Sequence, residues 1–401
     1  MKTRILFCYT WLLPLVISAN GPQGINESNN MFAFKLFDNV KSGADKNIFY
    51  SPFSISTALA MTYAGARNET ALQISQTMNF RPGNTFHSDY KYLLNLMNGG
   101  TDGKIKLNIA NGLWAQKNFK FLDSYFDIVK SNYHSVLQNV DFNDDIEREK
   151  TRKEINGWVE NQTNEKIKNL ISQGDLSSLT KLVLVNAIYF YGEWEVPFKK
   201  ESTAPKDFFL SDKTRINVPF MNQLGRYNYF EDSNLKVIEV PYKENKASIV
   251  IFLPHKNIGI GKFKKSFDYK YYQHIIRSFQ ITDIRLSLPK FQTTFKINLG
   301  STLSQMGMPL AFSSTNADFS GMTGKRNLCI SEVIHQAFIN VDEKGTEAAA
   351  ATAVIMKAMS ARPSSDLKEF NADHPFLFII KENTTGTILF MGNIMNPDVS
   401  K

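Results

Sequence analysis

The chain has 401 residues, of which 43% are hydrophobic and 12% aromatic, and this composition excludes an intrinsically disordered protein. The formal net charge of +8 is modest for the length, and no nucleic-acid-binding signature accompanies it. Beyond the N-terminus no apolar run reaches the length of a membrane span, so we expect no membrane association.

The N-terminus has the pattern of a secretory signal peptide. A basic start precedes an apolar run over residues 5–17, followed by small residues at Ser18 and Ala19. The run is too short to span a bilayer. We therefore expect residues 1–19 to be removed, leaving a secreted, extracellular protein whose residues 20–401 form a single domain.

Cysteine usage and glycosylation triplets add two expectations. Cys8 falls in the predicted leader, so only Cys329 remains and no internal disulfide is possible. Because Cys329 lies in an apolar run, we expect a buried and unreactive thiol. The Asn-x-Ser/Thr triplets that are candidates for N-glycosylation begin at Asn26, Asn68, Asn161 and Asn383.

Helices are predicted first along the chain. Asn29 and Asn30 are candidate caps for a helix over Met31 to Val40, and a second helix is predicted to begin within residues 51–54. The continuous apolar run from Leu182 to Phe190 instead predicts a central strand that is covered on both faces.

The second half of the chain reads mainly as strands, with a hairpin turn at 382–386 between the last two. The predicted strands are 237–240, 247–253, 284–288, 376–380 and 387–391. Helices followed by strands, without strict alternation, indicate an α+β domain with mostly antiparallel sheets.

Motifs of catalysis are absent from the sequence. It contains no G-x-S-x-G, H-E-x-x-H or C-x-x-C pattern, and its six histidines lack metal-ligand spacing. The glycine-rich stretch at 99–104 lacks the spacing of a phosphate loop and is interpreted as a turn. We expect neither an enzyme nor a bound metal or cofactor, although a triad assembled from distant residues stays open.

Polar residues in apolar surroundings are more informative. Asn186 interrupts the predicted central strand, where a buried amide needs hydrogen-bond partners. Ser51, Ser54 and His335 also border apolar runs and can donate or accept hydrogen bonds. Either each is satisfied separately, or the four form one polar cluster under the central sheet.

The stretch GTEAAAATAVIMKAMSARP, residues 345–363, combines an alanine-rich first half that favours helix with Val354 and Ile355, which favour an extended chain. Taken alone, it fits a surface helix that runs into a loop.

Seven stretches, in order, resemble the serpin family over roughly residues 30–397. They are NIFYSPFSI (47–55), LVNAIYF (184–190) with Gly192 and Trp194, LPKF (288–291), ADFSGM (317–322), IHQAF (334–338), DEKGTEAAAA (342–351) and DHPFLF (373–378). The chain departs from the family at Tyr191, where a lysine is usual.

The resemblance implies a serpin fold of three β-sheets surrounded by eight or nine α-helices, with an exposed reactive-centre loop at about 343–366. A serine protease cleaves this loop and is trapped as a covalent acyl-enzyme while the severed arm inserts into the central sheet. Insertion of about fourteen residues at roughly 3.3 Å each would carry the protease on the order of 45 Å.

The sequence of the arm suits insertion because alternate residues of a strand face the same side. The positions of one parity are small or apolar and uncharged, namely Thr346, Ala348, Ala350, Thr352, Val354 and Met356. Charges fall on the opposite parity, at Glu347 and Lys357. Gly345 is expected to act as a flexible pivot.

By resemblance, the reactive bond is Met359-Ser360, which suits chymotrypsin-like or elastase-like proteases. A shift of one residue to Ala358-Met359 would favour an elastase-like pocket, and Lys357-Ala358 would attract trypsin-like enzymes. Arg362-Pro363 is disfavoured because proline follows the bond.

The resemblance also assigns three groups of residues. The hinge comprises Glu343, Lys344, Gly345, Thr346, Glu347, Ala348, Ala349, Ala350 and Ala351. Trp194, Lys290 and Glu343 form the breach at the top of the sheet, where the acid and the lysine are interpreted as a weak surface ion pair that gates strand separation. Ser51, Ser54, Asn186 and His335 form the shutter beneath its centre.

We expect a monomer whose partners are serine proteases, with weak polyanion binding at the basic stretches 148–153 or 262–265 left open. The alternatives are a non-inhibitory serpin that acts as a carrier or chaperone, and a secreted hydrolase.

Overall fold

The computed structural model describes residues 22–40, 45–81, 83–98, 104–211, 214–346 and 367–398. The predicted leader lies outside these ranges, and so do Glu347 to Ala351 of the hinge and the predicted reactive bond at Met359 and Ser360.

The described ranges contain ten α-helices, of which three have seven residues or fewer. The helices are α1 (Pro22–Asn39), α2 (Pro52–Gly65), α3 (Asn68–Met78), α4 (Phe86–Asn98), α5 (Asp123–Tyr133), α6 (Asp145–Gln162), α7 (Gly259–Lys264), α8 (Tyr269–Arg277), α9 (Gly300–Met306) and α10 (Ser320–Thr323). Short 3-10 turns lie at Lys200–Ser202, Lys243–Asn245 and Pro309–Phe312. Within these ranges no helix is long and apolar enough to cross a membrane.

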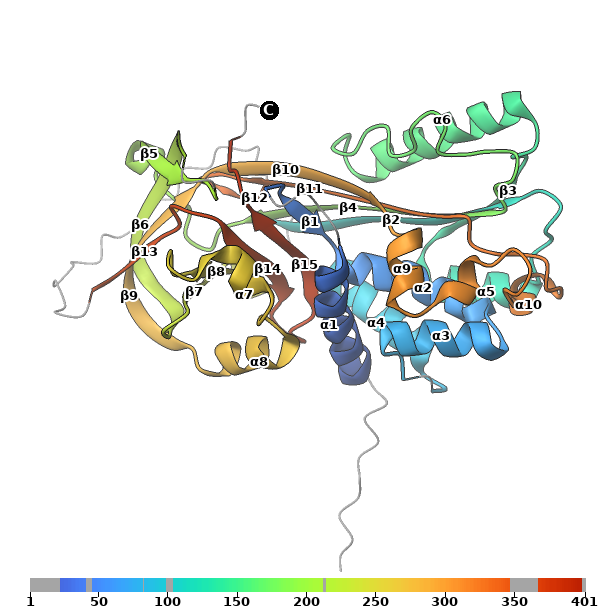
Figure 1. Ribbon diagram of the computed structural model, residues 1–401, viewed down its shortest axis with the longest axis horizontal. Helices are drawn as coiled ribbons and strands as arrows, with labels where there is room; N and C mark the ends of the chain where they lie inside the picture. Colours follow the sequence, from blue (N-terminus) through green and yellow to red (C-terminus); the bar gives the residue numbers. More distant parts are fainter. Residues whose placement is uncertain are drawn as a thin grey trace, which may run out of the picture.

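The strands form two hydrogen-bonded sheets in the described part of the chain (Figure 1). The six-stranded sheet has the order β10 (Phe291–Asn298), β11 (Glu332–Val341), β12 (Gly345–Thr346), β4 (Leu182–Glu193), β2 (Ile105–Gln116) and β3 (Val136–Val140). The nine-stranded sheet has the order β1 (Ile48–Tyr50), β15 (Ile388–Ile394), β14 (Phe376–Glu382), β8 (Ala247–Pro254), β7 (Leu235–Pro241), β6 (Arg215–Glu231), β9 (Gln280–Pro289) and β13 (Lys368–Asn371), and β5 (Ala204–Phe209) pairs with β6.

The three expected sheets appear as two because β6 is shared. The first part of this 17-residue strand pairs with β5, its middle with β9 and its end with β7. One long strand thereby continues from one layer into the next. Most strand pairs are antiparallel, as predicted, and the parallel pairs are β4 with β11, β2 with β3 and β9 with β13.

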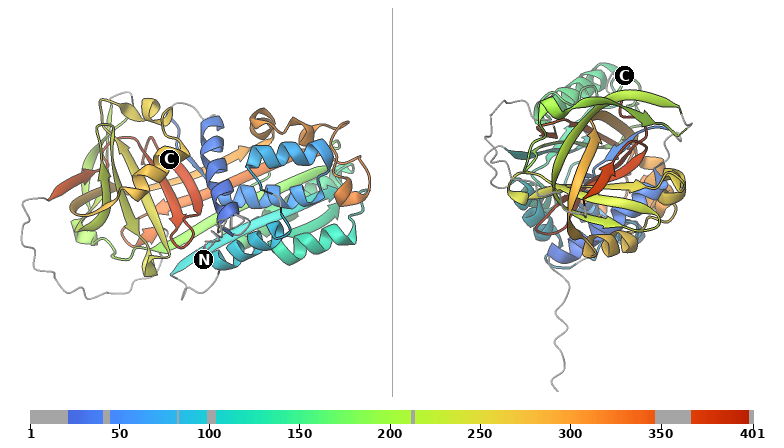
Figure 2. Two further views of the ribbon diagram at one scale, coloured as in Figure 1. Left: turned by 90° about the horizontal axis from the view of Figure 1, so that it is seen from below. Right: turned by 90° about the vertical axis from the view of Figure 1, so that its left-hand side faces the viewer.

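The six-stranded sheet lies between two layers of helices. Helices α2 to α5 cover one face and α6 covers the other (Figures 1 and 2). Strand β4 serves both sides: Leu184, Ile188 and Phe190 belong to the main core, whereas Val183 and Tyr189 belong to a second core under α6. The prediction of a central strand covered on both faces is confirmed.

Helix α1 begins earlier than predicted, at Pro22, and the two asparagines expected to cap it lie inside it. Asn30 accepts a hydrogen bond from the Ile388 amide at 2.8 Å and donates to the Gly386 carbonyl at 2.9 Å. Asn29 is fully buried and donates to the Ile388 carbonyl. The capping prediction was wrong because these side chains satisfy the last hairpin instead of a helix end.

Other local predictions are confirmed. Helix α2 begins within residues 51–54, as predicted, with Ser51 as its N-cap accepting the Ser54 backbone N–H, and β14 and β15 form the predicted hairpin. Cys329 is only 6% exposed, and burial raises the pKa of its thiol.

Candidate functional site

The short strand β12 is the centre of the site. Gly345 pairs with Glu193 and Thr346 with Gly192 on β4, and Thr346 also pairs with Val341 on β11. Further down, β4 and β11 pair directly with each other. The sheet is therefore parted at one end by two residues of the predicted hinge and closed below them.

Glycine is required at position 345 because the backbone of β4 approaches it closely. The sequence had suggested only a flexible pivot here. A Cβ at this position would lie 2.0 Å from the carbonyl oxygen of Gly192. Thr346 next to it is fully buried, and its hydroxyl lies 2.6 Å from that of Tyr242. The fold thus holds the beginning of the arm inside the sheet. The side chain of Thr346 faces the main core, to which Tyr242 belongs.

Trp194 encloses the hinge from the side. Its indole stacks on Tyr242 with ring centroids 4.6 Å apart, and its Nε1–H donates to the Asp342 carbonyl at 2.9 Å. Its backbone N–H donates to the Lys344 carbonyl at 2.9 Å. The residue is completely buried, so it fixes the turn that leads into β12.

Glu343 and Lys290 form the expected pair, but it is not a surface pair. Lys290 Nζ lies 2.9 Å from the Glu343 carboxylate, and the Thr203 hydroxyl donates to the other carboxylate oxygen at 2.9 Å. The Glu343 side chain is only 8% exposed. Burial acts to raise the pKa of Glu343, but the hydrogen bonds from Lys290 and Thr203 outweigh it and leave the pKa lowered.

This burial corrects the weak-pair interpretation. The backbone of Glu343 accepts from the Phe198 amide at 2.8 Å, which anchors the residue from a third direction. A buried carboxylate that loses its partner is costly, whereas an exposed one is not. The sequence could not show this because Thr203 and Phe198 come from a distant segment.

The four predicted shutter residues meet in one cluster. His335 on β11 bonds to the Asn186 side-chain oxygen, and the Asn186 amide donates to the Ser54 hydroxyl. Ser51 donates its hydroxyl to the Leu389 carbonyl at 2.6 Å, and its backbone N–H donates to His335 Nε2 at 3.2 Å. The cluster therefore joins β4, β11, α2 and β15.

Asn111 is a fifth member that sequence inspection missed. Its side-chain oxygen accepts the second hydrogen of the Asn186 amide, and the two residues are register partners on β2 and β4. His335 is the register partner of Asn186 on the other side. Three polar side chains thus form one row across three strands. An asparagine within a largely apolar strand could have identified this residue, but residues 105–116 were not predicted to form a strand.

The hydrogen bonds define the state of His335. Because the Ser51 N–H donates to Nε2, that nitrogen is an acceptor, and Nδ1 carries the hydrogen donated to Asn186. Complete burial lowers the pKa of His335 to about 3, so the ring is neutral at physiological pH. This neutral ring closes the seam between β4 and β11.

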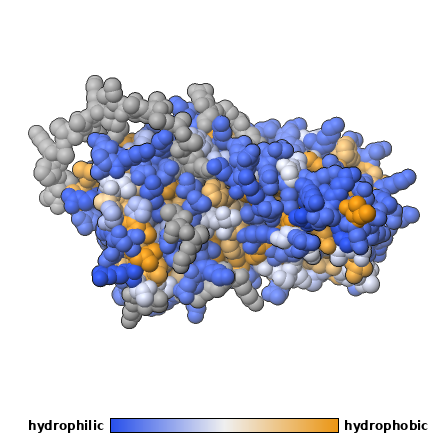
Figure 3. All heavy atoms as spheres, turned by 90° about the horizontal axis from the view of Figure 1, so that it is seen from above, coloured by the Kyte–Doolittle hydropathy of each residue, from blue (hydrophilic) through white to orange (hydrophobic). Residues whose placement is uncertain are grey.

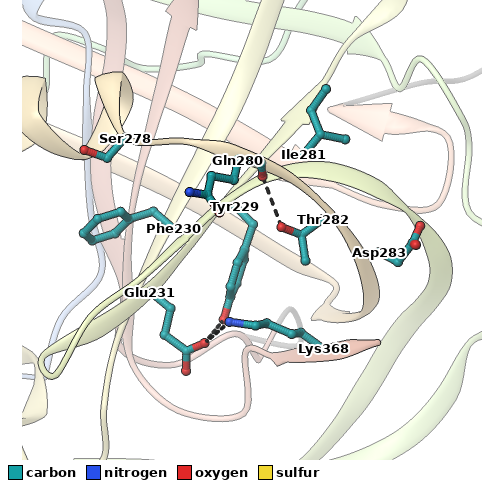
Figure 4. Close-up of a pocket in the computed structure, with 9 residues that line it drawn as sticks. All are labelled: Tyr229, Phe230, Glu231, Ser278, Gln280, Ile281, Thr282, Asp283 and Lys368. Atoms are coloured by element: carbon teal, nitrogen blue, oxygen red, sulfur yellow. Dashed lines mark hydrogen bonds and ion pairs between the residues drawn. The ribbon is translucent and has the colours of Figure 1, made fainter. Parts of the chain in front are cut away.

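A pocket of about 590 Å³ lies elsewhere, beside β13 (Figure 4). Its wall is largely polar, and its charged groups are already engaged: Glu231 accepts from Lys368 at 3.0 Å and from the Tyr229 hydroxyl at 2.9 Å. The pocket shares no residue with the hinge or the shutter.

The basic stretch on α6 is neutralised locally. Arg148 pairs with Asp145 at 2.5 Å and Arg152 with Glu149 at 2.8 Å. In the second basic stretch, Lys264 is half-buried and donates to the Asn393 side chain at 2.9 Å. Neither stretch presents a continuous field of unpaired cations.

The comparisons with known proteins agree with this geometry. The family model described as serpin (serine protease inhibitor) matches residues 27–397. Serpin B3 of Homo sapiens is 40% identical over 394 residues, covering 93% of this chain and 99% of that protein. The leukocyte elastase inhibitor of Xenopus tropicalis is 40% identical over 382 residues, covering 94% and 100%.

Solved structures give the same result. Human thyroxine-binding globulin superimposes with a TM-score of 0.84 at 31% identity, covering 94% of this chain and all of that one. Uncleaved ovalbumin gives a TM-score of 0.85 at 32% identity, covering 93% and 100%. The fold and site define an α+β protein with a parted central sheet, and the chain belongs to the serpin family.

Proposed function

We propose that this serpin inhibits serine proteases as a suicide substrate. The observation that carries the proposal is β12: two residues of the hinge already pair as an antiparallel strand between β4 and β11. In the proposed mechanism, this pairing would be the first step of strand insertion, made before any cleavage.

The register supports a continued insertion. Each residue added beyond Thr346 would pair one residue earlier on both neighbouring strands. Thr352 would then arrive at the row that holds Asn186 and His335, with the same parity as buried Thr346. Its hydroxyl would be placed to replace the hydrogen bond between these two side chains as they separate.

On the opposite parity, which also carries the charged residues Glu347 and Lys357, the middle of the arm is suited to burial. Odd-numbered positions 349, 351 and 353 are alanines, and they would face the second core beneath α6. Small side chains are needed there because this layer is already packed. The arm therefore matches both faces of the sheet that would receive it.

The proposed reaction begins with attack of a protease serine oxygen on the Met359 carbonyl. The Ser360 amine leaves with a proton, and an ester joins Met359 to the protease. Insertion of the severed arm then distorts the protease before water hydrolyses the ester. Chymotrypsin-like and elastase-like enzymes are the proposed targets, with Ala358-Met359 as the alternative bond.

Export to the extracellular space belongs to the proposal, and residues 1–19 support it through their signal-peptide pattern. A small-molecule carrier is the second candidate. It is favoured by the similarity to thyroxine-binding globulin and by the pocket beside β13.

Incubation with chymotrypsin, pancreatic elastase and trypsin tests the proposal on a denaturing gel. An SDS-stable complex, together with a released peptide that begins at Ser360, is the expected result. Cleavage of the loop without a complex would instead favour the carrier, and turnover of a substrate by undamaged protein would indicate a hydrolase.

A further inference from the structure

The four candidate glycosylation triplets differ in how the fold treats the amide that would carry a sugar. N-glycosylation joins the anomeric carbon of a lipid-linked oligosaccharide diphosphate to Asn Nδ2; the lipid diphosphate leaves, and the nitrogen gives up one hydrogen as a proton. The modified side chain keeps one N–H and must direct a bulky group into solvent.

Asn383 does not meet this condition. Its Nδ2 donates to the Asn245 carbonyl at 2.9 Å and to the hydroxyl of buried Ser248 at 2.7 Å. Its Oδ1 accepts from Lys381, which also pairs with buried Glu239 at 2.7 Å. A sugar on this amide would disrupt the turn between β14 and β15 and disturb a buried ion pair.

Asn26 is also constrained. Its amide donates to the Thr385 carbonyl, and its side-chain oxygen is buried without a partner among the described residues. Asn68 is more exposed, but its amide donates at 2.7 Å to Asp318, a residue that is only 4% exposed. A sugar at either position would replace one hydrogen of an amide that already donates to an internal acceptor, and the one remaining N–H would have to keep that bond.

Asn161 differs from the other three asparagines in its hydrogen bonding. It is exposed in the last turn of α6, and its side chain makes none of the hydrogen bonds found among the described residues. Its neighbours Ile155 and Val159 form the inward face of the helix, in the second core. Figure 3 looks onto the side that carries α6 and shows a mainly hydrophilic surface there. A sugar at Asn161 would break no hydrogen bond found among the described residues.

Thr163, the hydroxyl residue of this triplet, indicates when the transfer occurs. In the fold it is completely buried and donates to the Val159 carbonyl at 2.8 Å. Asn161 and Thr163 are therefore accessible together to the transferring enzyme only before the end of α6 packs against the rest of the protein. The sugar must be added to the unfolded chain, and the finished fold then determines which modified chains are tolerated.

We propose that Asn161 carries the N-glycan of the mature protein and that Asn26, Asn68 and Asn383 remain unmodified. This inference rests on the proposed export. Chains that receive a sugar at Asn26 or Asn383 cannot complete the contacts of the last hairpin, and they are lost before secretion.

The test uses the full chain secreted from eukaryotic cells, once with its own residues 1–19 and once with an unrelated secretory leader in their place. Peptide N-glycosidase F in heavy-oxygen water converts each occupied asparagine to a labelled aspartate, which peptide mass spectrometry locates. Label at position 161 alone is expected. An unlabelled position 161, or label at 26, 68 or 383 in secreted protein, would overturn the inference.

The second leader separates the two proposals. If the protein is secreted only with the unrelated leader but carries label at 161, export has failed and the glycan inference stands. Asn161→Gln should abolish the mobility shift caused by the glycosidase, whereas Thr163→Ser, which preserves the triplet, and Asn68→Gln should retain it. A shift that persists in Asn161→Gln contradicts the assignment.

Discussion

The two ends of the seam between β4 and β11 are held in different ways. At the upper end the strands are parted around Gly345 and Thr346, and a buried ion pair fixes the adjoining turn. Lower down the strands are joined directly, and neutral His335 bonds to Asn186 across the seam. The proposed insertion would therefore begin at the parted end and would next have to break the hydrogen bond between His335 and Asn186, which we call the polar lock.

The largest expected effect comes from Thr346→Arg at the parted end. Thr346 is fully buried, so a charged side chain cannot follow the same path into the core. Cleavage should continue, but the SDS-stable fraction should fall by at least about tenfold because one misplaced charge costs several kcal/mol. Quantitative gels with elastase or chymotrypsin measure this fraction.

Thr346→Ser is the matched control because it keeps the hydroxyl that contacts Tyr242. Unchanged complex yield in the arginine variant would contradict the proposal that the cleaved arm inserts from this position.

At the polar lock, Asn186→Ala should destabilise the intact protein by roughly 2–4 kcal/mol, since it leaves buried partners on three sides unsatisfied. Urea unfolding followed by circular dichroism gives the free energy of unfolding. Asn340→Ala on β11 provides a control of the same chemistry, because Asn340 is half-buried and its side chain makes no hydrogen bond to the described residues. Equal losses in the two variants would argue against the cluster.

The pH dependence of stability sharpens the comparison. The pKa of His335 is lowered to about 3 in the fold, whereas it is about 6.5 in the unfolded chain. Between about pH 3 and 6.5, the unfolded chain therefore binds a proton that the native state does not. Stability from this residue is complete above the unfolded pKa and falls as the pH falls, by up to about 1.4 kcal/mol per pH unit.

His335→Gln should remove this contribution and flatten the curve of unfolding free energy between about pH 4 and 6.5. Parallel curves for the variant and the parent would show that the histidine is not held neutral.

Lys290→Ala, at the upper end, should have the smallest effect, a loss of roughly 1–2 kcal/mol, because the buried Glu343 carboxylate loses one partner but keeps the hydrogen bond from Thr203. The pKa of Glu343 is lowered in the fold, so its stabilising contribution exists above the ordinary glutamate pKa and is lost as the pH falls through the folded value. The difference in melting temperature between variant and parent should therefore shrink in acid.

Lys200→Ala is the control for this variant, since Lys200 lines a small pocket together with Lys290 and Glu343 but pairs with no carboxylate among the described residues. A loss as large in Lys200→Ala would point to general surface charge instead of the pair with Glu343.

The sequence predicted best where a signal is local. The start of α2, the apolar strand β4 and the final hairpin depend on neighbouring residues, and each is found in the structure. Asn186 was also recognisable, because an amide within an apolar strand needs partners.

What could not be predicted depends on distant segments. Asn30 looked like a cap because the hairpin residues that bind it are more than 350 positions away. The burial of Glu343 depends on Thr203 and Phe198, and the role of Asn111 depends on strand register. Short-range patterns do not encode such contacts, which arise only when the sheet is assembled.

The most direct test of the account is the melting temperature of the protein before and after cleavage of the loop between residues 359 and 360. If the arm completes the strand that β12 begins, the cleaved form should melt higher, by on the order of 10 °C or more, because the sheet gains a full central strand. Equal melting temperatures for the two forms would show that the arm stays outside the sheet, and would contradict the proposed mechanism.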